Sequence, residues 1–297
     1  SLMEILCMGK EAIYRRLRGE VAFTFEEVSL ISQHLGISLD KIVGRRMLND
    51  TMFDLNLLHT GDPIESYYEI LVRYAKLFDL LRDDPTASVA TASNLIPFTF
   101  YSPYECLSKF RLGRWIYHHG KMKPPASLSD LQVPDKVPQM HWKLSASIRQ
   151  LSHTSFIWDY NIFRSIVKEI RYFAGLDLLS AEDVRNMKKE LGLLLSELEA
   201  VTMTGEFSKR HSLAIYLSDI NFEATYTYVE KGDFQACLFR VYSINSMDSQ
   251  NPRMCNIQKN WIQSLKRHST LISQSSEIQR RQFFNEQREI VESLQEA

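Results

Sequence analysis

Residues 9–43 of this 297-residue chain read GKEAIYRRLRGEVAFTFEEVSLISQHLGISLDKIV. The stretch begins with a short segment of helical spacing. Ile13 and Leu17 lie four positions apart, which predicts a helix over about Lys10 to Arg18 with both side chains turned inward. Gly19 predicts the end of this helix, because glycine readily adopts the left-handed backbone that follows a helix C-terminus.

A second helix is predicted to follow at once. Thr24 stands where an N-cap is needed, and Glu27 three positions later completes the pattern of a capping box. Val28, Ile31 and Leu35 then recur at the spacing of a single apolar helix face. We therefore expect two helices, joined by a short turn, that pack their apolar faces together.

The outward face of the first of these helices is rich in polar and basic side chains, namely Lys10, Glu11, Tyr14, Arg15 and Arg18. A short basic helix suits the major groove of DNA. Arginine and lysine reach the N7 and O6 atoms of guanine there, and arginine also pairs with phosphate. The alternative interpretation is a solvated face on a small helical bundle.

Residues 8–44, MGKEAIYRRLRGEVAFTFEEVSLISQHLGISLDKIVG, are similar to the Cro/C1-type (XRE-like) helix-turn-helix of bacterial transcriptional regulators. The resemblance covers about the first 44 residues of the chain, and the family's first helix would lie before Leu2. It implies that the recognition helix contacts bases and phosphates of double-stranded DNA through Lys10, Glu11, Tyr14 and Arg15. Arg18 would contact phosphate.

Charge and composition limit the kinds of ligand that the chain is expected to bind. The net charge is −1, and residues 1–58 hold seven basic against eight acidic residues, so no general nucleic-acid affinity is expected. DNA affinity would have to come from one helix face, present twice in a homodimer that reads two half-sites. The four cysteines show no metal-ligand spacing, and we expect neither a leader sequence nor a membrane-spanning apolar run. We expect a cytoplasmic protein without metal, cofactor or membrane contact.

The rest of the chain is predicted to be a larger helical domain. Residues 45–61 read as a connector, and Asp62 caps a long helix that opens residues 62–297. Three runs (213–217, 222–229 and 234–244) are rich in aromatic and β-branched residues and predict a small antiparallel sheet. The expected fold class is therefore mainly α with a small antiparallel β-sheet, an α+β arrangement.

One predicted helix has a regular apolar stripe, formed by Val184, Met187, Leu191, Leu194, Leu198 and Val201. The 3-4-3-4-3 spacing is typical of a helix seam. It fits either a dimer seam or a packing face within the chain. The aromatic residues between 98 and 117 likewise fit either a ligand pocket or an ordinary core.

No catalytic signature is present. The sequence lacks GxGxxG, GxxxxGK[ST], GxSxG and HExxH, so we do not expect an enzyme. The favoured hypothesis is a DNA-binding transcriptional regulator whose C-terminal domain dimerises and responds to a small-molecule or protein effector. The alternative is a protein–protein interaction module that retains the helix-turn-helix fold without binding DNA.

Overall fold

The computed structural model of the chain describes residues 1–35, 39, 53–56, 61–119, 127–221, 223–241 and 243–294. The chain divides into two compact units, Ser1–Met52 and Phe53–Ala297. The end of the predicted 1–44 unit and most of the predicted 45–61 connector lie outside the described residues.

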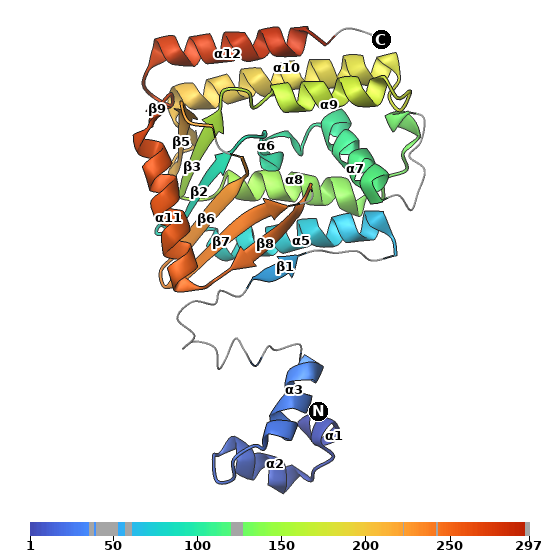
Figure 1. Cartoon of the computed structure of the whole chain (residues 1–297), viewed down its shortest axis with the longest axis vertical. Helices are drawn as coiled ribbons and strands as arrows, with labels where there is room; N and C mark the ends of the chain where they lie inside the picture. Colours follow the sequence, from blue (N-terminus) through green and yellow to red (C-terminus); the bar gives the residue numbers. More distant parts are fainter. Residues whose placement is uncertain are drawn as a thin grey trace. The chain divides into compact units, whose positions relative to one another are not determined.

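The described part of the first unit is helical (Figure 1). It consists of α1 (Leu2–Leu6), α2 (Lys10–Leu17) and α3 (Phe25–Leu35). Leu6 and Ile13 are its buried apolar side chains among the residues described, at 8% and 4% exposure. The core of this unit is therefore small.

The second unit is built on one mixed sheet. Its strands are β1 (Asp54–Asn56), β2 (Ser88–Ser93), β3 (His153–Asp159), β4 (Glu206–Ser208), β5 (His211–Ser218), β6 (Tyr226–Lys231), β7 (Phe234–Val241), β8 (Asn245–Ser249) and β9 (Ser269–Leu271). The order across the sheet is β1-β8-β7-β6-β2-β3-β5-β4, and β9 also pairs with β5. The three central strands β2, β3 and β5 run parallel, and all other pairings are antiparallel.

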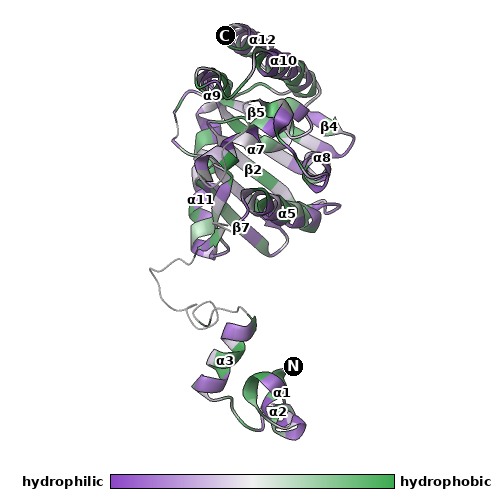
Figure 2. Ribbon diagram, turned by 90° about the vertical axis from the view of Figure 1, so that its right-hand side faces the viewer, coloured by the Kyte–Doolittle hydropathy of each residue, from purple (hydrophilic) through white to green (hydrophobic). Residues whose placement is uncertain are grey.

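Helices cover both faces of this sheet, as parallel strands require. Figure 2 shows α11 on one side and α5 and α8 on the other. The helical elements are α5 (Pro63–Leu81), α6 (Phe98–Tyr101), α7 (Glu105–His119), the 3₁₀ turn Leu128–Asp130, α8 (Lys136–Ile148), α9 (Arg164–Ala174), α10 (Ala181–Thr204), α11 (Pro252–Arg267) and α12 (Glu277–Glu292). α11 closes a small apolar cluster that includes Ile262 and Leu265, and the remaining helices share the main core. Within the described residues, no helix is both long and apolar enough to cross a bilayer.

The prediction of a small antiparallel sheet in a mainly helical protein was wrong. The sheet has nine strands in the described part of the chain, and its centre is parallel. β2 carries the small and polar sequence SVATAS, which has no strong strand pattern. β3 contains the apolar run Phe156-Ile157-Trp158, and a run this short fits a buried strand and a buried helix segment equally well.

Two of the three predicted strands do form a hairpin. β6 and β7 pair in register from Tyr226↔Phe239 to Lys231↔Phe234. Gly232, at the turn, has φ +52, a left-handed backbone that glycine adopts without strain. The first predicted strand, β5, does not join this hairpin. It pairs in parallel with β3, which lies much earlier in the chain.

The regular apolar stripe lies on α10 and faces the chain's own core. Val184, Met187, Leu191, Leu194 and Leu198 are at most 3% exposed, and Val201 packs against the same cluster. α10 packs against α7, α9 and α12. The stripe is therefore an intramolecular packing face and not a dimer seam, because the chain's own core already covers these side chains.

Candidate nucleic-acid interface

α2 has the length and boundaries that its sequence predicts. Gly9 precedes it with an extended backbone, and the first helical hydrogen bond joins the Ile13 amide to the Gly9 carbonyl at 3.2 Å. Gly19 follows it with φ +76, where a side chain would be strained. The helix is thus bounded by glycine at both ends.

All five residues predicted to contact DNA are exposed on α2 or directly after it, namely Lys10, Glu11, Tyr14, Arg15 and Arg18. The Lys10 ammonium lies 5.7 Å from the ring centroid of Tyr14, a cation–π distance. The structure therefore places these residues together on accessible surface, as a recognition helix would need.

Arg15 and Arg18 converge on the carboxylate of Glu20. Arg15 Nε lies 3.4 Å and Arg18 Nε 2.7 Å from its two oxygens. All three side chains are about half exposed or more. Ion pairs this open contribute little to stability, so a phosphate group can replace Glu20 at little cost.

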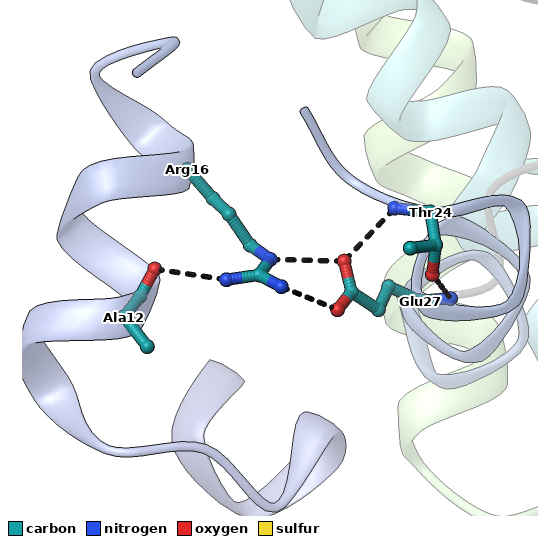
Figure 3. A network of polar contacts seen from close by, with 4 residues as sticks. All are labelled: Ala12, Arg16, Thr24 and Glu27. Carbon is teal, nitrogen blue, oxygen red and sulfur yellow. Dashed lines mark hydrogen bonds and ion pairs between the residues drawn. The ribbon is translucent and has the colours of Figure 1, made fainter. Parts of the chain in front are cut away.

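The opposite side of α2 carries an arginine whose role the sequence analysis missed. Arg16 donates two parallel hydrogen bonds to Glu27 of α3, from Nε at 2.9 Å and from Nη2 at 2.8 Å (Figure 3). Its Nη1 also donates to the Ala12 carbonyl at 3.4 Å. This fork geometry fixes the orientation of α2 against α3 and not only their distance.

The same glutamate completes the predicted capping box. The Thr24 amide donates to Glu27 at 2.9 Å, and the Glu27 amide donates to the Thr24 hydroxyl at 3.3 Å. Glu27 therefore caps α3 and holds α2 with one carboxylate. The hydrogen bonds from Arg16, with that from Thr24, lower the pKa of Glu27, while Glu27 raises the pKa of Arg16.

The prediction that Leu17 turns inward with Ile13 was wrong. Leu17 is 58% exposed, and the side of the helix that faces α3 is occupied by Arg16. Positions three and four after Ile13 lie on either side of it on the helix surface, so spacing alone did not decide between them. The signal for Arg16 was the acidic Glu27 at the N-cap of the next helix, which was assigned only a capping role.

The geometry separates α2 into a structural side and an accessible side. Arg16 holds the helix in place, and its neighbours Arg15 and Arg18 remain available to a ligand with phosphate groups. Tyr14, at 49% exposure, adds an aromatic hydroxyl that can contact a sugar–phosphate backbone or a base edge. Within the described residues, no group of three His, Cys, Asp or Glu side chains is placed to hold a metal ion.

Comparison of the chain with protein-family models, with curated proteins and with solved structures found no match.

Proposed function

We propose that the chain is a sequence-specific DNA-binding transcriptional regulator that places α2 in the major groove. The observation that carries this proposal is the division of α2 into two sides. Arg16 is committed to Glu27, whereas Lys10, Tyr14, Arg15 and Arg18 are exposed together. A helix that an ion pair holds on one side, with cations and a tyrosine exposed on the other side, is suited to reading DNA.

The number of cations limits the affinity of one copy. Lys10, Arg15 and Arg18 neutralise at most three phosphates. The dependence of log K on log salt would then have a slope of about −2.7 for one copy and about −5.4 for two. We therefore propose that two copies act together on two half-sites, a geometry that suits a two-fold symmetric operator.

The test is selection of bound fragments from sheared genomic DNA at low salt, with the full chain. The wild type should enrich sites with two-fold symmetry, and the double variant Tyr14→Ala, Arg15→Ala should lose them. Arg281→Ala is the matched control, because it removes an exposed arginine from α12 of the other unit. Circular dichroism should show unchanged helix content in both variants.

Titration against salt adds a second readout to this test. Arg15→Ala should reduce the magnitude of the salt slope by about 0.9 per copy, since one phosphate contact is removed. Equal enrichment by the wild type and the double variant, or no enrichment by the folded wild type, would exclude this function.

A protein-binding role is the second candidate, and one observation favours it. Leu17 and Phe25 are 58% and 81% exposed, although both are large and apolar. A protein partner would cover them. Phe25→Asp should then abolish capture of the partner without changing DNA retention, whereas the regulator proposal requires DNA retention that Tyr14 and Arg15 control.

A further inference from the structure

A partly open cavity of about 90 Å³ lies in the larger unit. Its walls come from strands β2, β3, β6, β7 and β8 on the sheet side and from α5, α6, α7 and α8 on the helix side. By this measure one water molecule needs roughly 10–15 Å³, so the space holds several waters or one small molecule.

The charged side chains that line this cavity, among the residues described, are all positive. Arg111 of α7 and Arg240 of β7 both line it, although they are far apart in sequence. Thr91 and Thr227 on the strands, and Thr225 just before β6, add hydroxyl groups, and no aspartate or glutamate lies among the described lining residues. The cavity therefore brings two cations and several hydroxyls together, with no carboxylate among the lining residues that the structure describes.

Arg111 is held in position but not neutralised. It is 9% exposed, its Nη1 donates to the Tyr101 hydroxyl at 2.6 Å, and its guanidinium carbon lies 4.3 Å from the ring centroid of Phe98. Its Nε has no hydrogen-bond partner among the described residues. His141 remains neutral, because burial and then the charge of Arg111 lower the pKa of its imidazole to about 3.

The side chain of Arg240 has fewer polar contacts than that of Arg111 within the described residues. Its half-buried side chain forms no hydrogen bond or ion pair with the part of the chain that the structure describes. Burial, and then the charge of Arg111, lower the pKa of Arg240, but a guanidinium remains charged at any physiological pH. The carboxylate of Glu169, which feels the charge of Arg111, is ion-paired with Arg114.

We propose that this cavity binds a small oxyanion, a carboxylate or phosphate group, between Arg111 and Arg240. Two neighbouring cations, one buried and one half-buried, are costly unless an anion offsets them. The planar guanidinium presents paired N–H donors that match the oxygens of a carboxylate or phosphate. The apolar walls, which include Val89, Phe156 and Leu238, accept a short hydrocarbon remainder.

The site does not depend on DNA binding, so it is tested without DNA. Thermal unfolding of the full chain is followed in a chloride-free zwitterionic buffer during titration with sodium phosphate, acetate, propionate or butyrate. Sodium chloride at equal ionic strength is the control. We expect a saturable rise in the unfolding temperature with at least one of these anions. The responding anion, phosphate or a carboxylate, identifies the class of ligand.

Two arginine variants decide whether the response comes from this cavity. Arg240→Met should lower the affinity for the anion by about 10- to 100-fold, the usual effect of removing one charged hydrogen-bonding partner. Arg281→Met, an exposed arginine of the same unit, should leave the affinity unchanged. Arg111→Lys keeps the charge but loses the fork and should weaken binding less than Arg240→Met.

The unfolding temperature without anion gives an independent readout. Removal of an uncompensated cation should leave the temperature of Arg240→Met equal to or above that of the wild type, whereas a purely structural Arg240 would make it fall. The proposal is overturned if no probe gives a saturable response, if Arg240→Met binds as tightly as the wild type, or if that variant is destabilised without anion.

Discussion

Arg16 in Ser1–Met52 and Arg111 in Phe53–Ala297 are both packed against their own unit, but only Arg16 meets a carboxylate. Glu27 accepts two hydrogen bonds from Arg16, whereas the Nε of Arg111 has no partner in the part of the chain that the structure describes. The small unit has few buried apolar side chains, so a paired charge helps to hold it. The large unit has an extensive apolar core and tolerates cations that are free to meet a ligand.

The largest effect is expected from the apolar core of the larger unit. Leu191 of α10 is fully buried, and Leu191→Ala should lower the free energy of unfolding by about 2–5 kcal/mol. Leu193, on the same helix, is 53% exposed, and Leu193→Ala should change it by less than about 0.5 kcal/mol. Urea unfolding measures both. A loss in Leu191→Ala that depended on protein concentration would instead indicate a dimer seam.

The next effect concerns the ion pair of the smaller unit. Arg16→Met and Glu27→Leu should each reduce the hydrogen-exchange protection of the α2 and α3 amides, since each leaves a partner unpaired. The double variant should recover part of the loss, because the two side chains interact directly. Losses that simply add would show that the pair does not couple α2 to α3.

Acid should weaken the same contact. Arg16 lowers the pKa of Glu27 from its usual value near 4.5, so the ion pair stabilises the folded unit fully above that pH. As pH falls below about 4.5, protonation should progressively remove this stabilisation. Amide exchange in α2 measured from pH 7 to pH 3 checks the trend. Glu27→Gln is the control and should show a flatter profile.

The smallest effects are expected from the N-cap residues of one helix in each unit. Thr24 caps α3 and Ser180 caps α10, each within a capping box. Replacement of either by alanine should cost about 1 kcal/mol. The unfolding temperature should shift more for Thr24→Ala, because about 1 kcal/mol corresponds to a larger change in a small unit than in a large one. Equal shifts in a calorimeter would indicate that the two units unfold together.

Local signals in the sequence predicted the local parts of the structure. Asp62 caps α5 by accepting the Ile64 amide at 2.8 Å, Thr24 and Glu27 form the capping box of α3, and the last two predicted strand runs supply β6 and β7. These features depend on residues a few positions apart. The exposed face of α2 was predicted on the same basis, from residues within one short helix.

Features that depend on distant residues could not be predicted in this way. β2 is a strand because β3 and β6 flank it, not because of its own side chains. Arg111 and Arg240 line one cavity only because α7, which packs on α5 and α10, and strand β7 come together in the folded unit. On α11, Ile257 and Trp261 are apolar and four positions apart, yet they are 53% and 47% exposed, while Gln258 and Ile262 are buried.

The edge pairing of β1 with β8 sets an order of events during synthesis. Asp54 pairs with Asp248, so the first strand of the larger unit has no partner until most of the chain has been translated. At about 5–20 residues per second, this wait lasts roughly 10–40 s. The contacts among α1, α2 and α3 are local and need no such wait. A ribosome therefore presents a folded helical unit well before the larger unit can close, and changes that slow the docking of β8 would lower the yield of the protein without touching α2.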